Sequence, residues 1–440
     1  METLGVIPDK PESKGAELEP WIVVNPTNPD NMVAAWIQGP AVGHVASASF
    51  DGGATWESAV IPGISECSGG DYERASDPWL AFAANGDLYT VALSHDLGRS
   101  QPSAIQVNKS FDGGRTWGAP ISIADEVGED KPSITADPED PCLVFVGWTR
   151  FMEVRGNDAL LLSRTTDCGE TWTEPEVLDS GRFSPSGFQL VVLPDGTALA
   201  FFKKQIQGEL YVKRSTDRGE TWPDAPTLIT VTGRSVNPVT PDGAVAIRSS
   251  LNLFDVAVDR KTGYLTAVWE DLFGGAPLSS PVQVAFSSSS DGGLTWSDPI
   301  RIDRTPPNMP FPLEQAFIPS VEISDDGTIG VTYYNFENDM PDQPPSWSDC
   351  WFVHCHPELA DCNDPSNWSD ALRLTPDSFD YLKAPFTDLT LNQGLFLGDY
   401  VGLTSFGSDF FALFSVTTAG DDPADVIFVP IRAGGDRQGR

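Results

Sequence analysis

The sequence predicts an all-β fold, a β-propeller built from four-stranded antiparallel blades. Two observations carry this prediction: a turn-forming octapeptide recurs along the chain, and a pair of short apolar strands stands before each good copy. A third observation agrees with them. Gly (40) and Pro (37) are spread evenly through the 440 residues, which is typical of many tight turns between short strands.

The octapeptide has the pattern Ser/Thr-x-Asp-x-Gly-x-Thr-Trp. Its copies are SFDGGATW (49–56), SFDGGRTW (110–117), TTDCGETW (165–172), STDRGETW (215–222) and SSDGGLTW (289–296), with a degraded sixth copy, DCNDPSNW, at 361–368. In each copy the aspartate can accept backbone N–H groups across a turn, the glycine supplies a positive φ, and the tryptophan buries between sheets. Five equivalent sites would be unusual for catalysis or calcium binding. We therefore interpret the octapeptide as a structural turn between the third and fourth strands of each blade.

The strand pairs complete the blades. They are PWIVVNPTNPDNMVAAWI (20–37), DPWLAFAANGDLYTVAL (77–93), PSITADPEDPCLVFVGW (132–148), GFQLVVLPDGTALAFF (187–202), LFDVAVDRKTGYLTAVW (253–269) and FIPSVEISDDGTIGVTYY (317–334). A last unit, 397–431, holds three strands, and the segment near Leu4–Ile7 is expected to add its fourth strand and close the ring. We expect one domain over residues 1–440 with seven blades; six is the alternative.

Charge and cysteine content restrict the partners. The formal net charge of −36 disfavours nucleic acid and anionic membranes, and no run of 18 apolar residues predicts a membrane span. The first residues, METLGVIPDKPESKG, lack the pattern of a signal peptide, but six cysteines and the acidic composition favour a secreted protein. In CWFVHCHPELADC (350–362) the spacing matches no standard zinc site, so a disulfide from Cys350 or Cys355 to Cys362 is expected instead. No metal or cofactor is expected.

The repeated S-x-D-x-G-x-T-W string is the Asp-box signature, and over nearly its whole length the chain resembles the sialidase-like (BNR repeat) superfamily. The resemblance implies a glycoside hydrolase with a tyrosine nucleophile paired with a glutamate, an aspartate acid/base, and three arginines that clamp a sugar carboxylate. Tyr400, in GDYVGL, matches the family tyrosine. The arginines do not match: ELEPWIVV and residues 384–399 contain none, and Gly187 or Gln189 stands where the glutamate is expected.

Propellers bind ligands at the face formed by loops that enter each innermost strand and leave each second strand. In a chain with only 27 basic residues, several fall at these positions: Arg74, Lys131, Arg150, Lys203, Lys204 and Arg248. Such a cluster favours an anionic ligand, above all a carboxylated sugar or another small anion, because arginine binds carboxylates bidentately. The alternative is that these cations pair with Asp77, Glu270, Asp271 or Asp399 between blades.

Asp77 and Tyr400 are the leading catalytic candidates from the sequence. A buried Asp77 can protonate a leaving oxygen, and Tyr400 becomes nucleophilic if Glu314 or Glu270 takes its proton. Tyr334 is a further candidate, although it can equally pack within its strand. Asp399 and His95 are expected at the binding face. A binding propeller without catalysis, or a lyase or isomerase that uses a tyrosine with His95 or Lys131, remains an alternative to the hydrolase.

Overall fold

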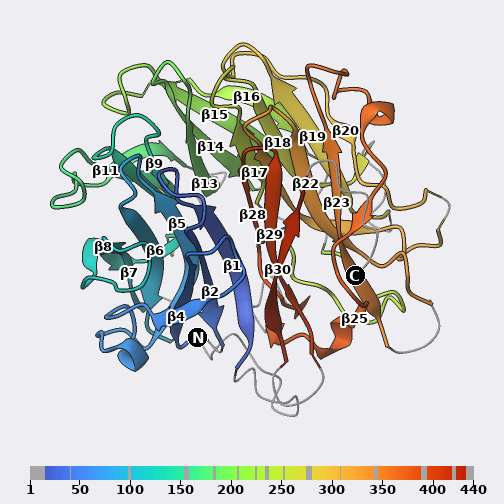
Figure 1. The fold of residues 1–440 in the computed structure, drawn as a ribbon, viewed down its shortest axis with the longest axis horizontal. Coiled ribbons are helices and arrows are strands. Elements are labelled where there is room, and N and C mark those ends of the chain that lie inside the picture. Colours follow the sequence, from blue (N-terminus) through green and yellow to red (C-terminus); the bar gives the residue numbers. More distant parts are fainter. Residues whose placement is uncertain are drawn as a thin grey trace.

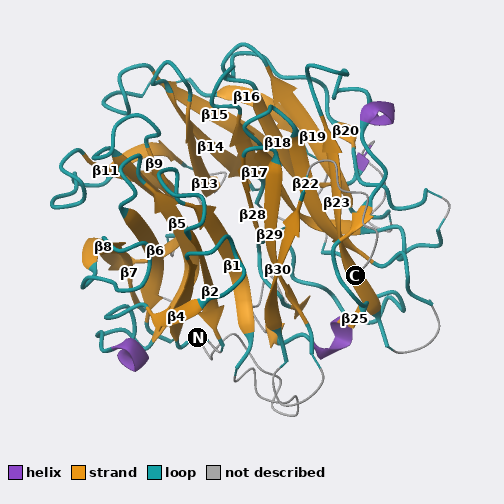
Figure 2. Ribbon diagram, viewed as in Figure 1, coloured by secondary structure: helices purple, strands orange, loops and turns teal. Residues whose placement is uncertain are grey.

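Seven antiparallel sheets form the blades of a closed ring (Figure 1). The computed structural model describes residues 15–39, 41–97, 101–152, 158–181, 185–205, 208–222, 225–232, 237–250, 253–273, 280–307, 309–340, 345–387, 394–418 and 423–432. Within these residues almost all regular structure is strand, and the few helices are short (Figure 2). The predicted seven-bladed β-propeller is confirmed, and the six-bladed alternative is wrong.

The first four blades follow one another along the chain. Blade 1 holds β1 (Glu17–Val24), β2 (Met32–Gln38), β3 (Gly43–Ser49) and β4 (Glu57–Val60), and blade 2 holds β5 (Arg74–Phe82), β6 (Leu88–His95), β7 (Pro102–Ser110) and β8 (Ile121–Val127). Blade 3 holds β9 (Glu129–Ala136), β10 (Val144–Arg150), β11 (Ala159–Thr165) and β12 (Glu176–Ser180). Blade 4 holds β13 (Pro185–Val192), β14 (Ala198–Lys204), β15 (Glu209–Ser215) and β16 (Thr227–Val231).

The remaining three blades are less regular. Blade 5 holds β17 (Asp255–Val258), β18 (Leu265–Asp271), β19 (Gln283–Ser289) and β20 (Ile300–Arg301). Blade 6 holds β21 (Ala316–Ile323), β22 (Ile329–Asn335), β23 (Trp347–Cys355) and β24 (Leu372–Arg373), and β25 (Phe379–Asp380) also pairs with β23. Blade 7 holds β28 (Gly402–Phe406), β29 (Asp409–Val416) and β30 (Asp425–Ile431). Outside the blades lie the strand pair β26 (Phe386–Thr387) and β27 (Gly394–Leu395), and 3-10 helices at Glu66–Ser68, Pro365–Asn367 and Tyr381–Lys383.

The ring closes between blade 7 and blade 1. The innermost strands contact one another in the order β1, β5, β9, β13, β17, β21, β28 and back to β1. At the junction the Glu17 amide donates to the Ala424 carbonyl (2.8 Å) and the Glu19 amide to the Leu397 carbonyl (3.2 Å). The fourth strand expected for blade 7 near Leu4–Ile7 lies outside the described residues.

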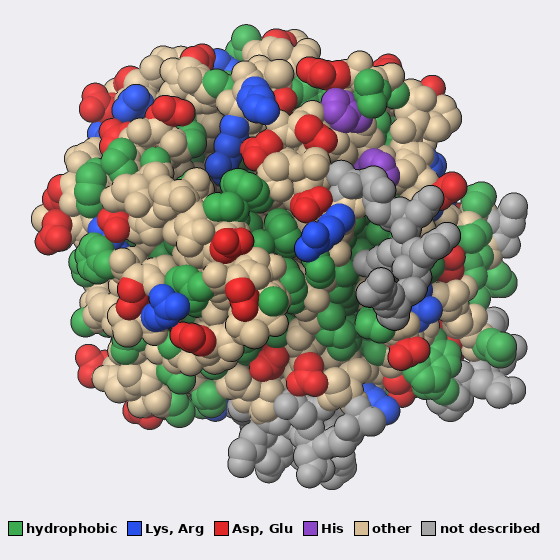
Figure 3. All heavy atoms as spheres, in the orientation of Figure 1, with side chains coloured by type: hydrophobic (Ala, Val, Ile, Leu, Met, Phe, Trp, Pro, Cys, Tyr) green, Lys and Arg blue, Asp and Glu red, His purple; other side chains and the backbone are tan. Residues whose placement is uncertain are grey.

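The apolar core lies between neighbouring blades. Between blades 2 and 3, for example, Val91 of β6 packs with Val146 and Trp148 of β10, and all three are fully buried. On the face in Figure 3 acidic side chains are scattered around a hollow near the middle, where apolar side chains gather. No helix among the described residues is long and apolar enough to cross a membrane.

The five good octapeptides form the same turn, and each joins the third strand of its blade to the fourth. In the first copy Asp51 Oδ1 accepts hydrogen bonds from the Ser49 hydroxyl (2.9 Å) and the Thr55 amide (2.8 Å), while Oδ2 accepts one from the Thr55 hydroxyl (2.6 Å). These hydrogen bonds, led by the Thr55 hydroxyl, lower the pKa of Asp51 to about 2. Because strands alternate in direction, these turns lie at the opposite end of the blades from the starts of the innermost strands.

The octapeptide tryptophans contact the preceding blade. Trp56 meets Phe428 of blade 7 with ring centroids 5.1 Å apart, and Trp296 meets Phe201 of blade 4 at 5.9 Å. Trp368, in the degraded sixth copy, contacts Phe286 of blade 5 at 5.0 Å. The interpretation of the octapeptide as a structural turn therefore agrees with its contacts.

Replacing Trp296 by phenylalanine is expected to lower the free energy of unfolding by about 1–2 kcal/mol. The change removes the indole N–H that donates to the Gly293 carbonyl (3.3 Å) and part of the ring that packs on Phe201. Urea unfolding measures the effect. Trp347, which is 37 % exposed, is the matched control, since Trp347→Phe should change stability by less than about 0.5 kcal/mol. Equal losses in the two variants would contradict a role for Trp296 between blades.

Two disulfides lie within single blades. Cys355 pairs with Cys362 in blade 6, which is one of the two pairings predicted for the 350–362 segment. Cys142 pairs with Cys168, so the β9–β10 turn is joined to the octapeptide turn of blade 3. Cys67 is an exposed free thiol and Cys350 a buried one.

Candidate functional site

The innermost strands share a second repeated feature, a bulge near the strand start. At this point the pairing with the second strand shifts register, and one residue adopts a positive φ: Glu19 (52°), Asp77 (56°), Lys131 (52°), Gly187 (68°) and Ile318 (51°). In four of these blades a proline follows, in the strings EPW, DPW, KPS and IPS. Positive φ is uncommon for residues other than glycine and tends to occur at functional sites. The bulges therefore mark one level of the propeller axis as a candidate site.

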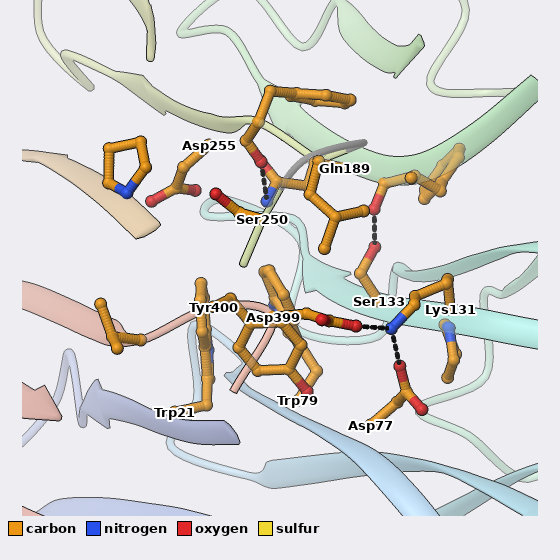
Figure 4. Close-up of a pocket in the computed structure, with 17 residues that line it drawn as sticks. Trp21, Asp77, Trp79, Lys131, Ser133, Gln189, Ser250, Asp255, Asp399 and Tyr400 are labelled. Carbon is orange, nitrogen blue, oxygen red and sulfur yellow. Dashed lines mark hydrogen bonds and ion pairs between the residues drawn. The ribbon is translucent and has the colours of Figure 1, made fainter. Parts of the chain in front are cut away.

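A pocket lies at this level. Every blade contributes to its wall, so the pocket sits on the propeller axis (Figure 4). The lining residues are Trp21, Asp77, Trp79, Lys131, Pro132, Ser133, Gly187, Phe188, Gln189, Ser250, Leu253, Phe254, Asp255, Pro319, Asp399, Tyr400 and Val401. Below it, toward the ends of the innermost strands at Val24, Phe82 and Ala136, lies a second hollow.

Charged side chains converge at one side of the pocket. The Lys131 ammonium lies 3.1 Å from Asp77 Oδ1 and also contacts Asp399 Oδ2 (Figure 4). Asp399 in turn accepts two bonds from the Arg248 guanidinium, Nε to Oδ1 at 2.8 Å and Nη2 to Oδ2 at 2.5 Å. Glu19 stands behind them and accepts a bond from the Asp399 amide (3.2 Å). The network thereby joins blades 1, 2, 3 and 7 and the chain that enters blade 5.

The pKa values in this cluster follow the pairing. Burial alone would raise the pKa of Asp399, but Arg248 and Lys131 hold it well below its usual range. Burial would lower the pKa of Lys131, but Asp399 and Asp77 raise it well above its usual value. Glu19 lacks such a direct cation, and burial together with Asp77 raises its pKa. Lys131, Arg248 and Asp399 are therefore charged at neutral pH, whereas Glu19 is held toward its protonated form.

The positive pocket predicted from the sequence is not what the structure shows. Lys131 and Arg248 pair with Asp77 and Asp399, as the alternative interpretation stated, because the same bulges bring carboxylates beside them. The other predicted cations lie outside the pocket lining. Arg150 is paired with Glu129 (2.9 Å from Nε to Oε1) and Lys204 with Asp179 (3.1 Å).

Arg74 and His95 also lie outside the pocket lining. They are opposite each other where β5 pairs with β6, and burial lowers the pKa of both side chains. His95 Nδ1 lies 3.1 Å from the Asp96 carbonyl. Lys203 is fully buried, and burial lowers its pKa to about 8.

Tyr400 forms an aromatic wall with two tryptophans. The Trp21 and Trp79 rings stack with their centroids 3.5 Å apart. The Tyr400 ring lies edge-on to both, with centroid distances of 5.9 Å to Trp21 and 5.2 Å to Trp79. The Tyr400 hydroxyl donates to the Pro78 carbonyl (2.9 Å), and burial followed by nearby carboxylates raises its pKa well above the usual value. The expected contact between Tyr400 and a glutamate is corrected: the hydroxyl has a backbone partner and is held protonated.

The other three catalytic candidates lie outside the pocket lining. The Glu270 carboxylate accepts bonds from Ser249 (2.7 Å), Ser250 (2.8 Å) and the Ile318 amide (2.8 Å), so it supports the wall from behind. Glu314 pairs with Arg301 (3.1 Å), and fully buried Tyr334 donates to the Ser415 carbonyl (2.8 Å) in the core. Each of these groups has hydrogen-bond partners outside the pocket, so the pocket geometry does not support the catalytic roles expected for Glu270, Glu314 and Tyr334, and those roles stay predictions.

Asp255 is the pocket residue that the sequence reasoning missed. It lies at the start of β17 and lines both the pocket and the hollow below. Oδ2 accepts bonds from the Ser320 hydroxyl (2.7 Å) and the Val321 amide (2.8 Å), and Oδ1 one from the Val256 amide (3.0 Å). Burial outweighs these bonds and raises the pKa of Asp255 to about 6.

A strand-by-strand alignment could have found Asp255. It is paired with the fourth residue of its second strand, Val268. The residues at the same register position in blades 1 to 4 and 6 are Trp21, Trp79, Ser133, Gln189 and Ser320. Asp255 is the one carboxylate among them, so its position, rather than its local sequence, is the signal.

The comparisons with known proteins show the fold. No protein-family model matches the chain, and no curated protein matches it. Among solved structures, the Hadza microbial sialidase Hz136 is 17 % identical with a TM-score of 0.50, over 72 % of this chain and 63 % of the sialidase. A protein of unknown function from Dyadobacter fermentans is 13 % identical with a TM-score of 0.50, over 97 % of both chains. At these identities the likeness is one of architecture.

Proposed function

We propose that the protein is a glycoside hydrolase whose catalytic pocket lies on the propeller axis. The observation that carries this proposal is a pair of carboxylates, Asp77 and Asp255, in one aromatic-lined pocket (Figure 4). They come from blades 2 and 5, three positions apart in a ring of seven, so they face the pocket from opposite sides. Two carboxyl groups in different environments, one partly protonated and one beside a cation, are what glycoside hydrolysis requires.

Asp255 has the properties of the general acid. A carboxyl with a pKa near 6 still holds its proton over much of the slightly acidic range, and it can deliver that proton to the leaving-group oxygen as the glycosidic bond breaks. Asp77 has the properties of the opposing base or nucleophile. Its Oδ1 is paired with the Lys131 ammonium (3.1 Å), and its Oδ2 accepts a bond from Ser76 (2.8 Å).

Asp77 can act in either of two ways. It removes a proton from the water that attacks the anomeric carbon, or it attacks that carbon itself and the glycosyl ester is hydrolysed afterwards. In both cases one water molecule is consumed, and its proton replaces the one that Asp255 gave to the leaving group. Trp79 and Tyr400 offer ring surface for the apolar face of a sugar.

The test is a glycoside panel assayed with wild type and Asp77→Asn, in which kcat/KM should fall by about 100- to 10,000-fold. Asp112→Asn, in an octapeptide turn at the other end of blade 2, is the matched control and should retain full activity. Since Asp77→Asn also loses an ion pair, Asp77→Ala should be tested with added azide. Recovery of turnover with a glycosyl azide product supports the role of Asp77. The anomer that the wild type first releases distinguishes the two modes, because direct attack by water inverts the anomeric carbon, whereas attack by Asp77 followed by hydrolysis retains it.

Two outcomes would overturn the proposal. One is wild-type activity in Asp77→Asn on every glycoside that the protein hydrolyses. The other is binding of sugars without turnover of any glycoside, which would favour a binding propeller. Formation of an unsaturated uronate, detected by its ultraviolet absorbance, would instead indicate a lyase.

We also propose that the protein is secreted. The two disulfides, Cys142–Cys168 and Cys355–Cys362, support this location because disulfides persist in oxidising compartments. The test counts free thiols on the unfolded protein. We expect two, Cys67 and Cys350, both in protein collected from the culture medium and in the purified sample.

A further inference from the structure

We propose that the axial pocket selects sugars without a carboxylate, and that it binds an amino sugar at least as well as the neutral sugar. This inference rests on the proposed sugar pocket but not on catalysis. It replaces the carboxylated ligand that the distribution of basic residues in the sequence favours.

The first argument is that the cation in the pocket wall is already neutralised. Among the described residues that line the pocket, Lys131 is the single lysine or arginine. Its ammonium contacts both Asp77 and Asp399. Arg248 lies behind the wall and holds Asp399 through two nitrogens. A ligand carboxylate would have to displace Asp77 or Asp399 from Lys131 and leave that aspartate buried without its partner.

The second argument is the charge balance. Asp77, Asp255 and Asp399 are the acidic residues among the described residues that line the pocket, and Lys131 is the basic one. Two further carboxyl groups, Glu19 and Asp130, interact electrostatically with Asp77 and Lys131, against one further cation, Arg248. Even with Asp255, Glu19 and Asp130 protonated, Asp77 and Asp399 balance Lys131 and Arg248. The site therefore has no net positive charge to offer an anion, and each carboxyl that ionises makes it more negative.

The third argument comes from the aromatic wall. Trp21, Trp79 and Tyr400 contribute ring surface to the pocket, which favours C–H groups and cations rather than anions. Carboxylates beside such rings suit hydroxyl and ammonium donors, because ionised carboxylates only accept hydrogen bonds. Neutral hydroxylated sugars and their amino derivatives match this combination.

The test uses matched ligands that differ in charge at one position, C6: the methyl glycosides of galactose, 6-amino-6-deoxygalactose and galacturonate, and the same three in the gluco series. Calorimetric titration at pH 6.5 should give an amino sugar affinity equal to or above the neutral one, and a uronate affinity at least about tenfold lower. Tighter binding of the uronate, or no binding of any ligand in both series, would overturn the inference. Correct ranking without hydrolysis would leave the inference standing while the proposed hydrolase fails.

Two variants make the test specific to the Lys131 pair. Asp77→Asn removes one of the two carboxylates that contact the Lys131 ammonium. The ratio of uronate affinity to amino sugar affinity should therefore rise by at least about tenfold. Lys131→Gln should shift the same ratio in the opposite direction. Asp112→Asn, at the far end of the propeller, should leave the ratio unchanged. Equal ratios in all three variants would show that the Lys131 pair does not set the preference.

Discussion

Asp399→Asn is expected to lower the free energy of unfolding by about 3–5 kcal/mol. Asp399 is 3 % exposed, and its carboxylate is the shared partner of Lys131 and Arg248. Asparagine has nearly the same shape but no charge, so the change leaves the buried Lys131 and Arg248 without the carboxylate that both of them contact. Removing one member of a buried ion network is costly because the remaining charges stay buried without compensation.

Urea unfolding of wild type and four variants, Asp399→Asn, Arg248→Met, their double variant and Glu57→Gln, checks this expectation. Glu57→Gln is the control, since Glu57 and Arg115 form an exposed pair whose loss should cost less than about 1 kcal/mol. The double variant Asp399→Asn/Arg248→Met should be less destabilised than the sum of the single variants, because it removes a stranded cation together with its partner. A loss in Asp399→Asn no larger than in Glu57→Gln would contradict the network.

The same network predicts how stability changes with pH. The pKa of Asp399 is depressed in the folded protein, so its stabilising effect is present above the ordinary aspartate range near 4 and is lost as the pH falls below it. The pKa of Glu19 is raised, so its contribution has the opposite sign and is lost as the pH rises toward 8. Asp399→Asn should weaken the acid limb, to which octapeptide aspartates such as Asp51 also contribute, and keep the alkaline one.

The fold was predictable from the sequence because each blade repeats local chemistry. The Asp51 and Trp56 positions of the octapeptide are read directly from the letters, and their hydrogen bonds and ring contacts are local or involve the preceding blade. Counting the repeats and strand pairs was enough to predict seven blades. The short β20 and β24 of blades 5 and 6 did not hinder this, because the first three strands of those blades carry the pattern.

The site was predictable only in part, because it depends on contacts between distant residues. The sequence pointed to Asp77, Lys131, Asp399 and Tyr400, which do meet at the axis, although Lys131 and Asp399 are 268 residues apart. It gave no means of deciding whether the cations face a ligand or the aspartates. The strings EPW, DPW, KPS and IPS were a second repeat at the axis, and aligning the blades on them would have drawn attention to Glu19.

Replacing Asp255 by asparagine is expected to reduce kcat/KM by about 100- to 10,000-fold on glycosides with poor leaving groups. Asparagine cannot donate the proton that the departing alkoxide needs. On 4-nitrophenyl or 2,4-dinitrophenyl glycosides, whose leaving groups depart without protonation, the loss should be far smaller. The ratio of the two losses is measured within one preparation of the variant, so it does not depend on how much of that preparation is folded.

The pH profile gives an independent reading of the same carboxyl. If Asp255 is the acid, kcat/KM of the wild type falls as the pH rises through about 6, because the proton is then lost from the free protein. Asp255→Asn should lack this limb while keeping the limb set by the opposing carboxylate. If Asp255→Asn showed the same leaving-group dependence and the same alkaline limb as the wild type, Asp255 would not be the general acid. Asp255 would then act only through its bonds to Ser320 and Val321, which hold blade 6 against blade 5.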